Sequence, residues 1–158
     1  GAGRNGKIWI WSLPDGKLLR ELNGHTDRVR ALSFVPYSRQ LVSAGDDRTI
    51  RIWDPDNAQA IRQIRAGRAR VMSMLVPRSG PIATGGSDNV VRLWDRHTGN
   101  AIASLTGHTG TVAAFATDET RLYSGGFDTT VRVWRFGAGS ADPAQSAAQP
   151  SNAKAAHR

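Results

Sequence analysis

Tryptophan recurs along this chain at a nearly constant interval, and each copy ends a similar short run of residues. The four copies are separated by 42, 41 and 40 residues: Trp11, Trp53, Trp94 and Trp134. An Asn or Asp stands six residues before each of them: Asn5, Asp47, Asp88 and Asp128. The residues between are rich in β-branched side chains, which favour strands. A period of about 40 to 45 residues with this content indicates an array of repeated sheet units, in which each unit buries its apolar face against the next.

One period of the repeat predicts four short strands separated by turns. In the second unit we expect strands at residues 28–35, 40–44, 50–53 and 59–64. The tight turn between the second and third strands contains Gly45, Asp46 and Asp47, which supply unusual backbone angles and local hydrogen bonds. The other units supply equivalent segments: 7–11, 17–22, 71–76, 81–84, 90–94, 101–105, 111–116, 121–124 and 130–135. No window of comparable length carries an apolar stripe with helical period, so the sequence predicts an all-β chain of antiparallel sheets.

Two dipeptides recur at the ends of these units. Gly-His opens two of them and Trp-Asp closes two third strands: Gly24-His25, Gly107-His108, Trp53-Asp54 and Trp94-Asp95. With this combined spacing, residues 1 to about 136 resemble the WD40 repeats of β-propeller proteins. Three places depart from the pattern: Ala66-Gly67 in place of Gly-His, Trp11-Ser12 and Trp134-Arg135. The resemblance implies a WD40-type β-propeller.

The number of expected strands is too small for a closed propeller. Thirteen strands make about 3.25 four-stranded blades, with blade ends near 23, 65, 106 and 136, whereas closed propellers have typically ~4–8 blades. There is no initiator Met. We therefore expect residues 1–136 to be a fragment of a longer propeller, about seven blades being the commonest number in the family, with the remaining blades supplied by chain outside this sequence. Self-assembly of two copies is the alternative, but it yields six and a half blades.

The composition changes after the last unit. Residues 137–158 consist mainly of Ala, Ser, Gln and Pro, with almost no bulky apolar side chain. Such a segment cannot bury enough surface to offset the entropy lost on ordering. We expect it to be a disordered tail or linker; a docking peptide is the alternative.

Two sets of residues have the composition of a hydrolase triad. His25, Ser43 and Asp47 form the first set, and His108, Ser124 and Asp128 repeat it. A nucleophile must be exposed beside a pocket, and an active site does not normally recur once per repeat. The resemblance implies instead a structural tetrad inside each blade, in which the buried polar groups satisfy one another. Its expected members in the three larger blades are His25, Ser43, Asp47, Trp53, Thr84, Asp88, Trp94, His108, Ser124, Asp128 and Trp134. The third blade lacks the His, which predicts that it is the least rigid of the three.

The chain is basic, with 21 Lys and Arg against 13 Asp and Glu and a net charge of +8. Arg51, Arg92 and Arg132 each lie two residues before a repeated Trp, a place where the family commonly has a structural basic residue. The resemblance also implies that the loops before first strands and between second and third strands form a partner-binding face. By register these loops carry Arg4, Arg28, Arg30, Asp46, Arg70, Met72, Ser87 and Phe127. Such a set suits an acidic protein or peptide; the alternative is a solvated surface of a basic chain.

The hydrophobic content and the numbers of Cys and His residues exclude some classes of function. The chain is 39% hydrophobic, and none of its apolar runs approaches the ~20 residues that span a bilayer. It has no Cys, and its four His residues form no metal cluster, so the sequence predicts neither metal nor cofactor. No signal peptide is visible, which leaves the compartment open, with the cytoplasm favoured. The sequence favours a non-catalytic protein interaction scaffold. The alternatives are a regulatory or sensing module of a larger multidomain enzyme and an electrostatic nucleic-acid binder, which would lack interleaved aromatic side chains.

Overall fold

The computed structural model describes residues 1–118 and 120–135 of the 158-residue chain. This part of the chain contains thirteen β-strands in four antiparallel sheets and no helix. No membrane-spanning helix therefore occurs within these described ranges. The predicted tail, residues 137–158, lies outside them.

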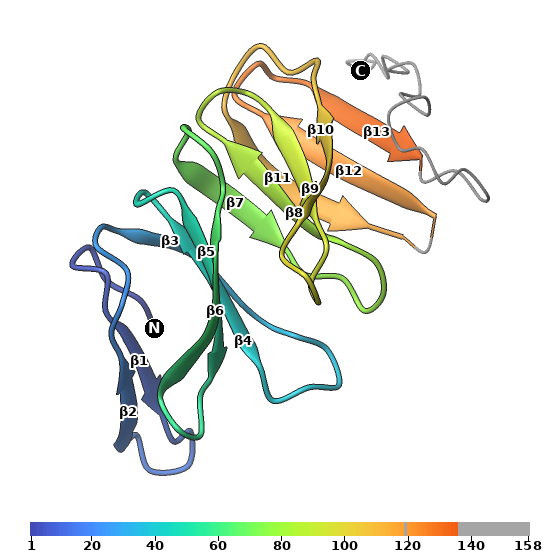
Figure 1. Cartoon of the computed structure of the whole chain (residues 1–158). Coiled ribbons are helices and arrows are strands. Elements are labelled where there is room, and N and C mark those ends of the chain that lie inside the picture. The colour runs from blue at the N-terminus through green and yellow to red at the C-terminus, as the bar shows by residue number, and fades with distance from the viewer. Residues whose placement is uncertain (119, 136–158) are drawn as a thin grey trace, which may run out of the picture.

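The four sheets follow one another in chain order, each a simple meander (Figure 1). The first sheet contains β1 (Ile8–Trp11) and β2 (Leu18–Leu22). The second contains β3 (Val29–Phe34), β4 (Leu41–Gly45), β5 (Thr49–Asp54) and β6 (Gln59–Arg65). The third contains β7 (Val71–Leu75), β8 (Ile82–Gly86), β9 (Val91–Trp94) and β10 (Ala101–Leu105). The fourth contains β11 (Val112–Thr117), β12 (Arg121–Gly126) and β13 (Val131–Arg135). The predicted all-β propeller fragment of about 3.25 blades is confirmed.

The turn between the second and third strands has the same conformation in every blade. The residue after the repeated Asn or Asp has a positive φ of 61–76° in each: Gly6, Arg48, Asn89 and Thr129. In the three larger blades its N–H donates to the carbonyl three residues earlier at 3.2 Å, as from Arg48 to Gly45. A short turn that ends in a left-handed residue suits the twist of an antiparallel hairpin. The Asp side chain stabilises it, because Asp47 Oδ1 accepts from the N–H of Thr49 at 3.1 Å.

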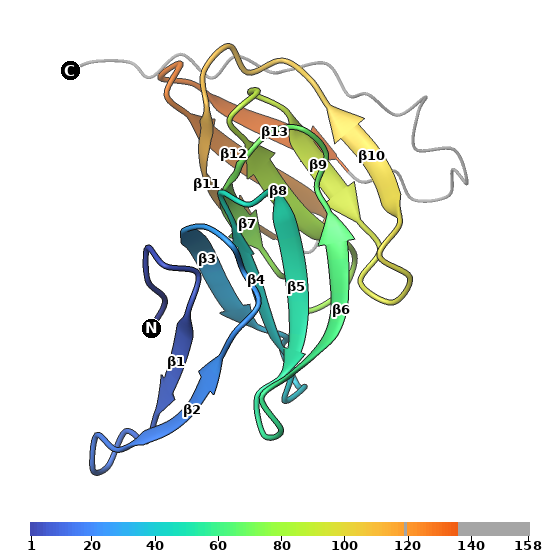
Figure 2. The ribbon, with the colours of Figure 1, turned by 60° about the vertical axis from the view of Figure 1, so that its left-hand side comes forward.

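Neighbouring sheets pack face to face (Figure 2). The buried apolar side chains lie between them. Each of three buried clusters spans two successive sheets, so every blade is stabilised by its neighbours. Between the first and second sheets, for example, Ile8 and Leu22 pack with Val29, Leu41 and Trp53. Burying one such aliphatic side chain contributes about 1.5–3 kcal/mol.

Trp11 differs from the other repeated tryptophans. Its side chain is 44% exposed, whereas Trp53, Trp94 and Trp134 are 1%, 5% and 7% exposed. Residues 1–3 pair with β1 only as far as Trp9, so among the described residues no strand stands beside Trp11 on that side to offer its indole a hydroxyl partner. The Trp period therefore correctly predicts the place of Trp11 in the repeat but does not predict that its side chain is exposed.

Candidate functional site

A chain of buried hydrogen bonds crosses the second blade. His25 Nδ1 lies 2.7 Å from Asp47 Oδ2, and His25 Nε2 lies 2.6 Å from Ser43 Oγ. The indole N–H of Trp53 donates to the same Ser43 Oγ at 2.7 Å. With the imidazole proton on Nδ1, the carboxylate accepts from His25, the imidazole accepts from the hydroxyl, and the hydroxyl accepts from the indole. Each of the four polar side chains in this series of hydrogen bonds then has a partner.

The fourth blade contains the same arrangement. His108 Nδ1 lies 2.8 Å from Asp128 Oδ2, and its Nε2 lies 2.8 Å from Ser124 Oγ. Trp134 Nε1 donates to Ser124 Oγ at 2.9 Å. In both blades the serine is buried and bonded to the indole, so its hydroxyl is not placed to attack a substrate.

The third blade has no His at this place, and an arginine binds the turn Asp instead. Trp94 Nε1 still donates to Thr84 Oγ1 at 2.8 Å. Asp88, however, is bound by Arg92 through two hydrogen bonds, Nη1 to Oδ1 at 3.1 Å and Nη2 to Oδ2 at 2.6 Å. The pair is partly exposed, with 37% of the Asp88 side chain accessible, whereas the Asp47 side chain is 3% exposed. The sequence did not predict this pair.

The equivalent arginines of the other two blades behave differently. Arg51 and Arg132 each have a buried Nε without a hydrogen-bond partner among the described residues. Arg51 lies with its guanidinium carbon 5.8 Å from the centre of the Trp53 ring. The position before His25 suits only Gly, because a side chain would collide with its neighbours. A Cβ on Gly24 would lie 2.6 Å from Arg51 Nη1 and 2.9 Å from the Trp53 ring.

The turn carboxylates are held in their charged form. Burial raises the pKa of Asp47, but the hydrogen bonds that its carboxylate accepts from His25 and Thr49 outweigh burial and lower the pKa to about 2. Burial also opposes ionisation of Asp128, and the N–H of Thr109 with the side chains of His108 and Thr130 lowers its pKa well below the usual range. The Arg92 guanidinium lowers the pKa of Asp88.

The residues expected on the partner-binding face are arranged by a repeated backbone contact. We use the term loop face for the turn before β1, the connections before β3, β7 and β11 with the first two residues of these strands, and the turns after β4, β8 and β12. In each of the three larger blades a turn N–H donates to the carbonyl of the residue that lies three positions after the His place. The three bonds are Asp46 to Arg28 at 2.9 Å, Ser87 to Arg70 at 3.0 Å and Phe127 to Thr111 at 2.9 Å.

The side chains on the loop face differ in exposure and charge. Arg4, Arg70, Ser87 and Phe127 are exposed, Arg28 and Met72 are half-buried, and Asp46 is buried. Arg30 is bound to Asp46, with Nε 3.0 Å from Oδ1 and Nη2 2.8 Å from Oδ2, so its charge is largely neutralised. Arg4 lies in the turn before β1 and has no equivalent loop contact among the described residues.

Comparison with known proteins identifies the repeat. The family described as "WD domain, G-beta repeat" matches residues 16–54, 59–95 and 99–135, which is more than half of the chain. The chain belongs to the WD40 repeat family. WD40 repeats are in general protein-interaction scaffolds, typically without enzymatic activity of their own, and this chain is a scaffold of that general kind.

Several WD40 proteins are similar to parts of this chain. WD repeat and SOCS box-containing protein 1 of Danio rerio is 48% identical over 63 residues, which cover 39% of this chain and 15% of the relative. CCR4-associated factor 4 homolog of Candida glabrata is 27% identical over 138 residues, 87% of this chain and 18% of the relative. The chain thus spans less than a fifth of these two proteins. Among solved structures, the computationally designed Ika4 protein has a TM-score of 0.77 at 27% identity, covering 86% of this chain and 83% of that one.

Proposed function

We propose that this WD40 segment is a non-catalytic scaffold that binds an acidic protein or peptide through its loop face. The observation that carries the proposal is the repeated bond from a turn N–H to the connection before the first strand, present in three successive blades. It places two loops side by side at the same edge of each sheet. Loops held on a rigid framework are where binding residues of such folds generally lie.

The charges of the loop face favour an acidic partner. No described carboxylate forms an ion pair with Arg4, Arg28 or Arg70. Guanidinium groups bind carboxylates through paired hydrogen bonds, so these three positions can receive acidic side chains. Phe127, which is 74% exposed, offers an apolar contact on the loop face of the fourth blade. Arg30 contributes less, because Asp46 already neutralises it.

We also propose how the chain is divided into a propeller segment and a tail. Residues 1–136 would form one part of a larger propeller, with blade boundaries near 23, 65 and 106, and residues 137–158 would be a tail or linker. The small share of each relative that the chain covers supports this organisation.

The test uses a double substitution on the loop face and a matched double substitution elsewhere. Arg28→Ala/Arg70→Ala removes two charges from the loop face, and Arg20→Ala/Arg39→Ala removes two exposed charges outside it. Binding of a fluorescent Glu-rich peptide is measured by anisotropy at several salt concentrations, together with the partners isolated with the full-length protein. We expect the first variant to weaken binding about tenfold or more and the second to leave it nearly unchanged.

Two outcomes would overturn the proposal. Equal binding by both variants would show that the loop face is only a solvated basic surface. Preference for an oligonucleotide over the acidic peptide, with an affinity that falls steeply with salt, would favour electrostatic nucleic-acid binding instead.

A further inference from the structure

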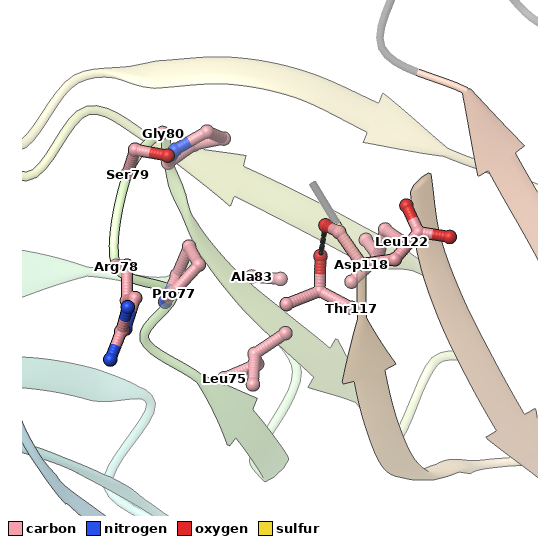
Figure 3. Close-up of a pocket in the computed structure, with 10 residues that line it drawn as sticks. Leu75, Pro77, Arg78, Ser79, Gly80, Ala83, Thr117, Asp118 and Leu122 are labelled. Atoms are coloured by element: carbon pink, nitrogen blue, oxygen red, sulfur yellow. Dashed lines mark hydrogen bonds between the residues drawn. The ribbon is translucent and has the colours of Figure 1, made fainter. Parts of the chain in front are cut away.

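A groove of about 740 Å³ separates the third and fourth blades at the edge of the sheets opposite the loop face (Figure 3). We call it the interblade groove. One wall is the connection between β7 and β8, and the other is the start of the connection between β11 and β12. The residues that line it are Leu75, Pro77, Arg78, Ser79, Gly80, Pro81, Ala83, Thr117, Asp118 and Leu122.

The interior of the interblade groove is largely apolar. Figure 3 shows Leu75 and Ala83 between Pro77 on one side and Thr117 and Leu122 on the other. Leu75 is half-buried, whereas Ala83 and Leu122 are buried and form the base. A concave apolar surface of this size can receive a large aliphatic or aromatic side chain.

The first wall is held in place by Arg96. Its Nη2 donates to the carbonyls of Pro77 at 2.9 Å and Gly80 at 2.8 Å, and its Nε donates to Gly80 at 3.2 Å. Three bonds from one guanidinium fix the β7–β8 connection as a ridge. The interblade groove is therefore formed before any ligand binds, which lowers the entropic cost of binding.

The second wall is fixed by its own carboxylate. Asp118 Oδ1 accepts from the N–H groups of Thr120 at 2.8 Å and Arg121 at 2.7 Å, and Oδ2 accepts from the hydroxyl of Tyr123 at 2.9 Å. Asp118 is thus engaged within its own connection. Its negative charge still disfavours a phosphate group in the interblade groove, which argues against a nucleic-acid ligand.

Arg78 supplies a cation at the rim. Its side chain is exposed and points away from Thr117 and Asp118, and its guanidinium carbon lies 4.9 Å from the centre of the Tyr37 ring in the second blade (Figure 3). Stacking occupies a face of the guanidinium group but leaves its N–H edges available. Among the described residues Arg78 has neither an ion-pair partner nor a side-chain hydrogen bond. Tyr37 itself is 84% exposed and has a φ of 59°, a strained backbone of the kind that clusters at functional positions.

We propose that the interblade groove binds an extended peptide segment that carries a large apolar side chain next to a carboxylate. The apolar side chain occupies the space between Leu75 and Leu122, and the carboxylate accepts from the free edge of Arg78. This second site is independent of the loop face, so the scaffold can hold two protein segments at opposite edges of the same blades.

A small peptide panel tests the proposal on the whole chain. The probes are fluorescent hexapeptides Ser-Gly-X-Asp-Gly-Ser with X as Leu, Ile, Phe or Trp, and the controls replace X by Ser or Asp by Lys. Arg78→Glu reverses the rim charge, and Arg39→Glu makes the same change at an exposed arginine in the β3–β4 connection. We expect at least one Asp peptide to bind, its affinity to fall about tenfold or more in Arg78→Glu, and Arg39→Glu to have little effect.

A second variant tests the apolar part of the interblade groove. Ser79→Trp places a bulky side chain at an exposed lining position and should abolish binding, with the hydrogen-exchange pattern of β8 and β12 unchanged as the folding control. Arg28→Ala/Arg70→Ala should bind the panel normally, so failure of this proposal and failure of the loop-face proposal are distinguishable. Lack of binding by every Asp peptide, or equal losses in Arg78→Glu and Arg39→Glu, would overturn the proposal.

Discussion

Arg92 binds Asp88 through two parallel hydrogen bonds, at the place where an imidazole meets the turn carboxylate in the two neighbouring blades. The third blade therefore keeps a nitrogen donor for its turn Asp although the repeat has lost its His. The replacement is incomplete, because the guanidinium does not reach the hydroxyl of Thr84 through its side chain. Asp88 and Thr84 are consequently parts of two separate contacts, and the bonds no longer run from the turn to Trp94.

The rate of amide hydrogen exchange at the hairpin turns should differ between the third blade and its two neighbours. The Val90 N–H donates to Asp88 Oδ1 at 3.4 Å, whereas the equivalent Thr49 and Thr130 N–H groups donate at 3.1 Å. We expect the amide of Val90 to exchange faster than those of Thr49 and Thr130, since a longer bond at a more exposed turn protects less. Hydrogen exchange followed by NMR measures all three in one sample. Slower exchange at Val90 would contradict the prediction that the third blade is the least rigid.

The Trp period and the strand alternation were enough to predict every strand to within two residues at each end. These predictions succeed because each blade repeats the same order of strands and turns and buries the equivalent apolar side chains. What the period could not predict is how a side chain behaves when a neighbour in the pattern is missing. Arg92 turns to Asp88 where the His is lost, and Trp11 is exposed where the inner strands are absent.

The interblade groove was missed for a different reason. Pro77 and Pro81 have the appearance of ordinary turn residues, and a single sequence carries no sign that Arg96 holds them beside Leu122 across a blade boundary. Contacts between blades depend on the packing of two sheets, which strand periodicity does not encode. Tyr37 and Arg78 follow Pro36 and Pro77 in equivalent connections, but the sequence does not show that their side chains stack on each other.

Removing the central hydroxyl should cost more in the second blade than in the third. Ser43→Ala leaves both the indole N–H of Trp53 and Nε2 of His25 buried without a partner. Thr84→Val leaves only the indole N–H of Trp94. An unsatisfied buried polar group costs about 1–3 kcal/mol, so we expect losses of about 2–4 kcal/mol for the first change and about 1–2 kcal/mol for the second. Urea unfolding of the two variants measures the difference; a larger loss in Thr84→Val would contradict the hydrogen-bond chain as the source of stability.

Acid should destabilise the second blade through Asp47. The pKa of this carboxyl is lowered from 3.8 to about 2 in the folded chain, so its contribution is fully present above pH 4 and is lost as the pH falls through 2. Asp47→Asn should therefore lower the free energy of unfolding at pH 7 by on the order of 2 kcal/mol, and the gap to the unsubstituted protein should close near pH 2.

The matched control for this change is Asp56→Asn. The Asp56 side chain is 62% exposed, and among the described residues its ion-pair partner is Arg39, at 3.3 Å. We expect its unfolding curve to follow that of the unsubstituted protein at every pH, because exposed pairs contribute little. A gap for Asp47→Asn that stays constant from pH 7 to pH 2 would show that the loss is steric rather than electrostatic.

Alanine substitutions at two glycines in equivalent turns should distinguish the cost of backbone strain from the cost of disturbed packing between blades. Gly16 and Gly99 have φ values of 65° and 80° in the turns before the fourth strands. A Cβ on Gly16 meets nothing within 4 Å, whereas one on Gly99 would lie 3.0 Å from Ile64 Cγ1 and 3.2 Å from Arg62 Cδ in the second blade. Gly16→Ala should cost about 1 kcal/mol for the left-handed backbone alone. Gly99→Ala should cost about 1–2 kcal/mol more, because the side chains of Ile64 and Arg62 must shift away from the added Cβ. Urea unfolding of the two variants under the same conditions measures the difference in the free energy of unfolding. Equal losses would mean that the contact between Gly99 and the second blade adapts to the added Cβ without destabilising the fold.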